Sequence, residues 1–317
     1  MTALLADPIS KEHHTGQDHP ERPERFDAVL MALERASLTE RMKRIESREA
    51  SEDELAYCHT GSYIRTARRD ISAVERRHGV SGLSTGDTTI SSQSWEVAVR
   101  SVGGVLNAVD AVFSTSVQNA FCVVRPPGHH ATPDRGMGFC IFNNVAIAAR
   151  HAQKKHGVER VLIIDWDVHH GNGTQDTFYH DGSVFFFSTH QSPWYPGTGH
   201  PAEIGEGKGA GTTLNCPFAA GAGHDEIAGA FRNQLIPAAD LFKPDFVIVS
   251  AGFDSRMGDP LGRFRLTDAD FAELTRMCLG IASKHAGGRL MTVLEGGYSL
   301  PGLGSAAATH ARELISA

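Results

Sequence analysis

The sequence lacks the features that mark secreted, membrane-spanning or nucleic-acid-binding proteins. Its five cysteines are odd in number and show no CxxC spacing, so neither a disulfide framework nor a cysteine-rich zinc site is expected. It has no run of about 18 apolar residues, and the N-terminal MTALLADPISKEHH has too short an apolar stretch for a signal peptide. Lysine and arginine number 30 against 37 acidic residues, so the net charge of -7 leaves no basic surface for phosphates. We therefore expect a reduced, cytoplasmic protein that binds neither membranes nor nucleic acid.

The residues that are present indicate one globular unit. Hydrophobic residues make up 41% of the chain and charged residues 21%, which is typical of a folded protein with a large core. No repeat, low-complexity tract or linker divides the sequence, so we expect a single domain over residues 1–317. A homo-oligomer is compatible with this composition. Composition leaves an enzyme or a binding protein, and the 17 histidines are the first indication of which.

Apolar periodicity predicts helices that alternate with short buried strands. Apolar residues recur every three or four positions over 95–113 and 26–33, and Thr267-x-x-Asp270 resembles the capping box of a third helix. Five runs are apolar on both faces, as buried parallel strands are: Phe121–Val124, Val161–Ile164, Val184–Phe187, Phe246–Val249 and Leu290–Leu294. The alternation predicts the α/β class, with a parallel sheet covered by helices on both sides.

A polar or glycine-rich loop follows each of these five runs. The loops are RPPGHH at 125–130, DWDVHHGNG at 165–173, STH at 188–190, SAGFD at 250–254 and EGGY at 295–298. Ligands bind beyond the carboxyl ends of parallel strands, because the loops converge there. The five loops therefore predict one site assembled from five places.

Two of these loops offer a set of metal ligands. Asp165, Asp167 and His169 alternate, so an extended backbone would turn all three side chains the same way. Asp254 can complete the set from another strand. Three protein ligands with an open position are typical of catalytic zinc. Strand-end caps are the alternative interpretation, and for Asp165 alone they are the better one.

Two other loops offer groups for proton transfer and hydrogen bonding. His129 and His130 follow a Pro-Pro-Gly turn, and imidazole titrates in the range needed to take a proton from water and return it to an amine. Tyr298 can place its hydroxyl against a developing oxyanion. Isolated histidines are more often packing residues, and we expect this of His224, His285 and His310.

Taken together, these motifs resemble the histone deacetylase superfamily, in particular its class II members and the bacterial histone deacetylase-like or acetylpolyamine amidohydrolases. The matching stretches are HTGQDHPERPER at 14–25, RPPGHH at 125–130, GFCIFNN at 138–144, DWDVHHGNGTQ at 165–175, AGFDS at 251–255 and EGGYS at 295–299. They extend over nearly the whole chain. The resemblance implies the three-layer α/β/α arginase/deacetylase fold, built around an eight-stranded parallel sheet.

The resemblance also implies a role for the metal-site residues and their neighbours. Asp167, His169 and Asp254 are expected to bind zinc. Asp165 is expected to lie behind them and orient His129, which contributes electrostatic stabilisation.

The groups that carry the chemistry are assigned in the same way. The resemblance implies that His130 is the general base and acid, with Asn172 as its partner where other branches carry Asp. Tyr298 matches the tyrosine that stabilises the transition state. Arg25 resembles an arginine of the internal channel through which acetate leaves.

The same resemblance implies a narrow acyl-lysine tunnel. Phe139 and Tyr195 are its expected aromatic walls, although the second is usually Phe, and Gly138 is expected to offer its carbonyl to the substrate amide. Leu261 stands where a polyamine-selective relative has Glu. Asp87 is a candidate either to grip a substrate backbone at the rim or to cap its own loop.

Monovalent cations are implied as well. Potassium is expected beside Asp165, Asp167, His169, Ser188 and Thr189. A second such site near Phe178 and Val184 is less well matched, because Asp181 departs from the expected pattern.

The expected function is zinc-dependent removal of acetyl groups from N-acetyl-lysine-like side chains of peptides, a hydrolysis of linear amide C–N bonds. Acetylated polyamines are the alternative substrates; Leu261 and the shortness of the stretch 77–95, where polyamine enzymes carry an insertion, favour acyl-lysine. A two-manganese ureohydrolase shares the fold but needs more bridging carboxylates than residues 251–255 supply. A metal-containing protein that binds acyl-lysine or polyamines without turnover is the remaining alternative.

Overall fold

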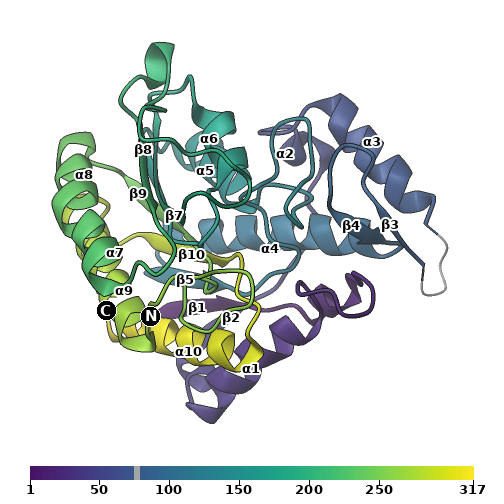
Figure 1. The fold of residues 1–317 in the computed structure, drawn as a ribbon, viewed down its shortest axis with the longest axis horizontal. Coiled ribbons are helices and arrows are strands. Elements are labelled where there is room, and N and C mark those ends of the chain that lie inside the picture. The colour runs from purple at the N-terminus through teal and green to yellow at the C-terminus, as the bar shows by residue number, and fades with distance from the viewer. Residues whose placement is uncertain (75–78) are drawn as a thin grey trace.

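The computed structural model describes residues 1–74 and 79–317 and contains one eight-stranded sheet. Arg77, at the start of the stretch 77–95, lies outside the described residues. The strands of the sheet are β1 (Thr2–Leu5), β2 (Met42–Ile45), β5 (Asn119–Cys122), β6 (Val161–Asp165), β7 (Val184–Gln191), β8 (Thr213–Phe218), β9 (Phe246–Ala251) and β10 (Leu290–Leu294). Their order is β2-β1-β5-β10-β9-β6-β7-β8, and every pairing is parallel (Figure 1). A small antiparallel hairpin, β3 (Val80–Gly82) and β4 (Thr89–Ser91), lies apart from the sheet.

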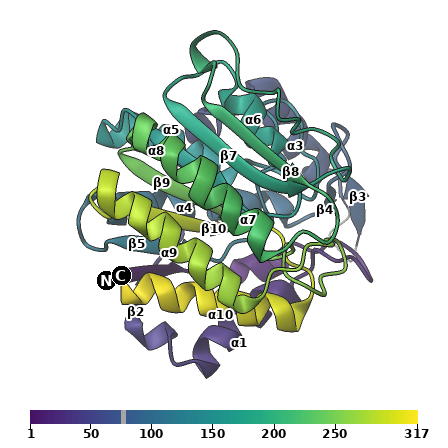
Figure 2. The ribbon, with the colours of Figure 1, turned by 60° about the vertical axis from the view of Figure 1, so that its left-hand side comes forward.

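Helices connect the strands and cover both faces of the sheet. They are α1 (Glu24–Arg35), α2 (Glu52–Leu55), α3 (Gly61–Ser72), α4 (Ser94–Phe113), α5 (Asn144–His156), α6 (Asn172–Phe178), α7 (His224–Ala230), α8 (Ile236–Phe242), α9 (Asp268–His285) and α10 (Leu300–Ser316). Short 3-10 turns occupy Pro8–Glu12, Thr39–Arg41 and Gly207–Gly209, and a π-helical turn at Phe231–Leu235 joins α7 to α8. The helices α7 to α9 lie on the near side of the sheet in Figure 2.

The sheet separates two hydrophobic cores because successive side chains of a strand point to opposite faces. Along β6, Val161 and Ile163 pack in a core with residues of α3, α4 and α5, whereas Leu162 and Ile164 pack in a core with residues of α1, α9 and α10. Both faces of the strand are therefore apolar, which is why the sequence shows a continuous apolar run. The predicted three-layer α/β/α fold is confirmed.

Element boundaries differ from the sequence-based ones at a few places. β5 is Asn119–Cys122 rather than 121–124, although the N–H of Val123 still donates to the carbonyl of Leu5 at 2.8 Å. β7 continues to Gln191, because its polar end pairs with β8. The predicted capping box is present: Oδ2 of Asp270 accepts the N–H of Thr267 at 2.7 Å at the start of α9.

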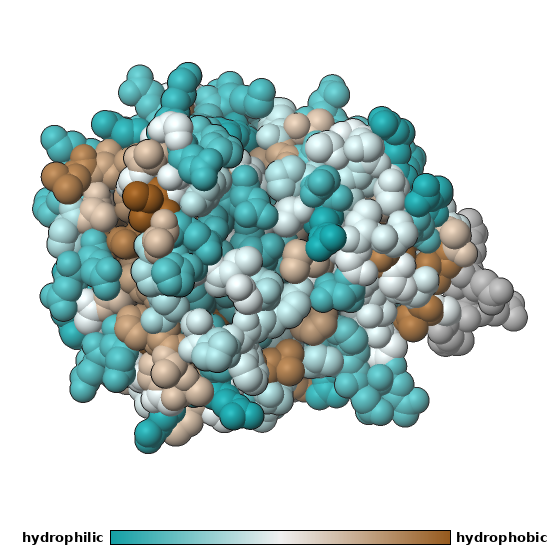
Figure 3. Space-filling view, turned by 45° about the horizontal axis from the view of Figure 1, so that its top comes forward, coloured by the Kyte–Doolittle hydropathy of each residue, from teal (hydrophilic) through white to brown (hydrophobic). Residues whose placement is uncertain are grey.

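Residues at the surface are mostly polar. On the face that Figure 3 shows, hydrophobic side chains form small groups among hydrophilic ones. Leu241 on α8 is the most exposed of the large hydrophobic residues, at 85%. All five cysteines lie within the described residues and are buried thiols. Among the helices in the described part of the chain, none combines the length and hydropathy needed to span a bilayer.

We expect Leu162→Ala to lower the free energy of unfolding by about 2–5 kcal/mol, because it leaves a cavity in the core beside β6. Urea-induced unfolding of the purified variant measures the change. Leu241→Ala is the matched control and should change the same quantity by less than about 0.5 kcal/mol, because its side chain is exposed. Equal effects of the two substitutions would contradict the assignment of Leu162 to the core.

Candidate active site

The five loops that the sequence predicts to form one site follow adjacent strands. The sheet order places β5, β10, β9, β6 and β7 side by side and parallel. Their carboxyl ends therefore meet at a single edge, where ligands bind in open parallel sheets. We call this side of the sheet the carboxyl edge.

Asp167, His169 and Asp254 converge at the carboxyl edge and form the candidate metal centre. Nδ1 of His169 lies 3.0 Å from Oδ1 of Asp167 and 3.2 Å from Oδ2 of Asp254. All three side chains are buried, and no hydrogen bond of good geometry from the described chain reaches Oδ2 of Asp254. Gly296 packs directly against them: a Cβ atom there would lie 2.1 Å from Oδ2 of Asp254, so a larger residue does not fit.

The electrostatics of this group favour a bound cation. Burial opposes charge on Asp167, but the charges and hydrogen bonds of His129 and His169 hold its pKa well below the usual value. Burial and the charge of Asp167 raise the pKa of Asp254 to about 7. Burial also disfavours a charged His169, yet the two carboxylates raise its pKa to about 10. A divalent cation would neutralise the same carboxylates, and an Asp/His/Asp set with an unpaired carboxylate oxygen fits zinc with one position open.

Asp165 does not join this group. β6 ends at Asp165 and the chain then bends, because Oδ1 of Asp165 accepts the N–H of Asp167 and Oδ1 of Asp167 accepts the N–H of His169. The expectation that an extended backbone turns all three side chains the same way is therefore wrong. Oδ2 of Asp165 lies instead 2.9 Å from Nδ1 of His129.

His129 and His130 lie side by side in opposite electrostatic environments. Their ring centroids are 4.0 Å apart. Burial opposes charge on His129, but Asp165 and Asp167 raise its pKa well above the ordinary value. Burial and the charge of His129 lower the pKa of His130 well below the ordinary value. Nδ1 of His130 lies 2.8 Å from Oδ1 of Asn172, an acceptor only, so the neutral ring carries its proton on Nδ1 and leaves Nε2 free to accept one.

Tyr298 is positioned by Asp259, which the motifs did not identify, and by Arg25. Oδ2 of Asp259 accepts the N–H groups of Tyr298 at 2.7 Å and of Ser299 at 3.0 Å. The guanidinium of Arg25 lies 5.0 Å from the Tyr298 ring and donates to two carbonyl groups of the same loop, at 2.5 and 2.7 Å. Burial raises the pKa of the Tyr298 hydroxyl well above the ordinary value, so it stays protonated and can donate.

Arg25 is part of a buried ion network. Oε1 of Glu21 accepts from Arg25 at 3.0 Å, and Oε2 of Glu21 accepts from Arg125 at 2.7 Å. Burial opposes charge on Glu21, but the two arginines lower its pKa to about 2. Arg25, which the resemblance places in an internal channel, is thus fully buried and donates hydrogen bonds to the loop of Tyr298. The sequence gives no indication of these hydrogen bonds beyond the HTGQDHPERPER motif.

The site opens into a cavity of about 310 Å³. Its lining residues are Asp87, His130, Gly138, Phe139, His169, Trp194, Tyr195, Leu261 and Tyr298. All four expected tunnel residues are among them, together with Trp194, the neighbour of Tyr195. Phe139 has a positive φ of 69°, an uncommon and strained conformation for a residue with a side chain. The carboxylate of Asp87 caps the neighbouring loop, since it accepts the N–H of Gly138 at 2.8 Å and the hydroxyl of Tyr195 at 3.1 Å.

The residues expected around monovalent cations lie close to the metal centre. Asp165 on β6 pairs in register with Ser188 on β7, and Thr189 follows, buried. An ion at this position stays a prediction. At the weaker second position, Asp181 forms an ion pair with Arg150 at 2.6 Å.

The isolated histidines lie outside the site. His224 and His285 contact carboxylates of neighbouring helices, and His310 is buried between Thr275 and Thr292. Within the described chain, the carboxyl edge has one group of three converging metal ligands, which gives no support to a two-metal ureohydrolase.

Known proteins resemble this chain over nearly its whole length. Residues 19–314 match the histone deacetylase domain. The chain is 41% identical over 313 residues to "Histone deacetylase 10, chloroplastic" of Oryza sativa subsp. japonica, covering 95% of this chain and 71% of that protein. It is 41% identical over 303 residues to "Polyamine deacetylase HDAC10" of Homo sapiens, covering 93% and 44%. The crystal structure of the HDA15 HD domain matches with a TM-score of 0.93 and 36% identity, over 99% of this chain and 89% of that one.

We expect Asp254→Asn to abolish metal binding at the candidate centre, because a neutral amide replaces one of the two carboxylates that would hold the cation. Elemental analysis of the purified protein gives the metal content, and circular dichroism checks the fold. Asp87→Asn at the cavity mouth is the control and should keep its metal, since Asp87 contacts Gly138 and Tyr195 instead. A full metal content in folded Asp254→Asn would rule out Asp254 as a ligand.

Proposed function

This chain belongs to the histone deacetylase family, and we propose that it is a zinc-dependent amidohydrolase that removes acetyl groups from N-acetyl-lysine-like side chains. One observation carries the proposal. His130, His169 and Tyr298 line the same narrow cavity, and Asp167 and Asp254 contact His169 at its inner end. A proton acceptor, a cation site and an oxyanion donor thus face the same small volume. A protein that only binds its ligand does not need the proton acceptor and the oxyanion donor.

The residues supply the steps of an amide hydrolysis. When bound, zinc supplies a Lewis acid that polarises the acyl carbonyl and lowers the pKa of water. Nε2 of His130 takes a proton from the attacking water, and the hydroxyl of Tyr298 donates to the carbonyl oxygen as negative charge develops there. Asp165 and Asp167 raise the pKa of His129, and a positive ring there would stabilise the negative charge that develops on the carbonyl oxygen. Nε2 of His130 then gives its proton to the nitrogen, the C–N bond breaks, and acetate and the free amine leave.

The cavity fits a linear aliphatic side chain. Gly138, Phe139 and Tyr195 line the cavity. The two aromatic rings would exclude water from the alkyl chain, and the carbonyl of Gly138 would accept from the substrate amide. Leu261 at the mouth is apolar rather than acidic, which favours acyl-lysine over acetylated polyamines. The human relative named a polyamine deacetylase supports polyamines as the alternative substrate class. We also propose potassium beside Asp165 and Ser188, where it would offset the buried carboxylate.

We expect wild-type protein to release free amine from acetyl-lysine peptides or acetylated polyamines, and a chelator to stop this. Tyr298→Phe should lower kcat by about 10²–10³ while keeping its zinc, because one oxyanion donor is lost. Tyr179→Phe, outside the cavity, is the control and should keep full activity. Most of the wild-type rate remaining in Tyr298→Phe would refute the role of Tyr298; tight binding of every substrate without acetate release would refute hydrolysis.

We expect Asn172→Asp to shift the pH profile of kcat/KM. The base must be neutral, so the acid limb reports protonation of His130. A carboxylate beside Nδ1 favours the charged ring and raises the pKa of His130, so the acid-side inflection moves to higher pH and activity falls most at the acid end. Asn233→Asp on the surface should leave the profile unchanged. An inflection that stays in place in Asn172→Asp would contradict the assignment of His130 as the base.

A further inference from the structure

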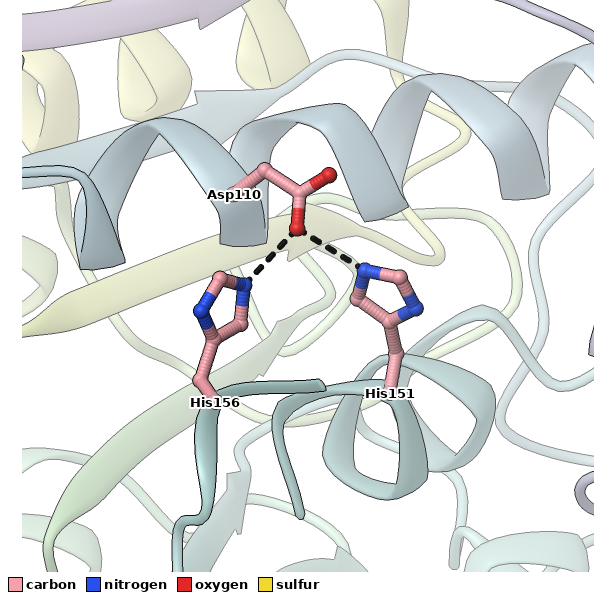
Figure 4. A group of neighbouring side chains, drawn as sticks. All are labelled: Asp110, His151 and His156. Atoms are coloured by element: carbon pink, nitrogen blue, oxygen red, sulfur yellow. Dashed lines mark hydrogen bonds and ion pairs between the residues drawn. The ribbon is translucent and has the colours of Figure 1, made fainter. Parts of the chain in front are cut away.

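A second group of metal-ligating side chains lies far from the carboxyl edge. Asp110 on the last turn of α4 faces His151 and His156 near the end of α5 (Figure 4). The Nε2 atoms of His151 and His156 lie 2.9 and 2.8 Å from the same atom, Oδ1 of Asp110. α5 ends here and β6 begins five residues later, at Val161, so the group lies at the amino ends of the strands. It is therefore separate from the candidate metal centre.

We propose that Asp110, His151 and His156 bind a divalent transition metal ion such as zinc, which would join α4 to α5. Two imidazoles and one carboxylate form a ligand set that suits zinc and other divalent first-row transition metals. In a tetrahedral zinc site with bonds of about 2.0–2.1 Å, the ligand atoms are about 3.3 Å apart. The two imidazole nitrogens, at 2.9 and 2.8 Å from the Asp110 oxygen, thus need to move away from that oxygen by only a few tenths of an ångström to admit the ion.

The rings of His151 and His156 both point toward the position that the metal ion would occupy beside Asp110. The ring of His156 stacks on Phe113 with 4.8 Å between centroids and 12° between planes. His151 is buried, and its Nε2 donates to the carboxylate of Asp110 when no ion is present. Its Nδ1 has no hydrogen-bond partner in the described chain, so Nδ1 is free to take up the ring proton when Nε2 binds a cation. Asp110 and His156 are 27% and 20% exposed, so an ion and a water ligand can reach them from solvent.

The ammonium group of Lys155 competes with a metal ion for the carboxylate of Asp110. Its ammonium lies 2.7 Å from Oδ2 of Asp110, the carboxylate oxygen that the histidines leave free. Since Oδ1 and Oδ2 face different partners, the ammonium and the metal can share the carboxylate. Lys155 nonetheless offsets part of the negative charge and weakens the site.

The same chain contains a matched cluster with one imidazole fewer. At the end of α9, Lys284 and His285 contact Oδ1 of Asp240 at 2.6 and 2.7 Å. This resembles the group of Lys155, His156 and Asp110, although there the lysine and the histidine contact different carboxylate oxygens. No counterpart of His151 appears among its contacts. The second imidazole therefore distinguishes a metal site from an ordinary ion cluster, and the α9 cluster serves as an internal control.

The test measures zinc bound by the holoenzyme beyond its catalytic ion. Protein loaded with one zinc is equilibrated with excess Zn²⁺ at neutral pH and freed of loose ions by gel filtration. Native mass spectrometry should then count two zinc ions per chain, and the melting temperature should rise with Zn²⁺ concentration. His156→Gln should remove the second ion and the thermal shift but keep the first ion and full deacetylase activity. His285→Gln should behave as wild type, and Lys155→Gln should bind the second ion more tightly.

Two results would overturn the proposal. The first is a wild-type protein that retains only one zinc ion per chain after this treatment. The second is a second zinc that persists in both His156→Gln and Asp110→Asn, which would place the ion elsewhere on the protein.

Discussion

Buried negative charge at the carboxyl edge is the constraint on which the rest of this structure depends. Four carboxylates are fully buried there: Asp165, Asp167, Asp254 and Glu295. Burial of a charge is unfavourable unless hydrogen bonds and opposite charges compensate it. Three of the four accept N–H groups from a loop of another strand, as Asp254 does from Val168, Asp167 from Gly296 and Glu295 from Gly128. These three carboxylates, two of which would bind a cation, therefore also tie the loops of four different strands together.

The same charges shift the pKa values of His129 and His130 in opposite directions. Asp165 and Asp167 favour a positive His129, and that positive charge together with burial keeps His130 neutral. In the proposed mechanism, the ring that accepts a proton and the ring that stays charged thus lie 4.0 Å apart and keep different protonation states. Asn172 preserves this separation, because an amide orients His130 without adding the negative charge that would raise its pKa.

The sequence predicted the α/β class and the loops of the site because both depend on local patterns. Strands buried on two faces leave continuous apolar runs, and contiguous motifs carry the catalytic residues. The edge strand β2, at 42–45, could not be found in this way, because two of its four residues are exposed. The roles of Asp259 and Arg25 could not be found either, since both act on the backbone of the Tyr298 loop from distant positions in the chain. The bend after Asp165 arises from side-chain-to-backbone hydrogen bonds that a period-two pattern does not encode.

The two groups of aspartate and histidine differ in how the charge of their carboxylates is balanced when no metal is bound. Asp254 at the carboxyl edge is fully buried, and its counter-charge within the described chain is the ring of His169, whose Nδ1 lies 3.2 Å from Oδ2 of Asp254. Asp110 is partly exposed and already has the Lys155 ammonium as a counter-charge. A metal at the first group would therefore replace a proton on a buried ring, whereas a metal at the second would share a partly exposed carboxylate with an ammonium group. This difference follows from burial rather than from ligand identity, because both groups contain the same two residue types.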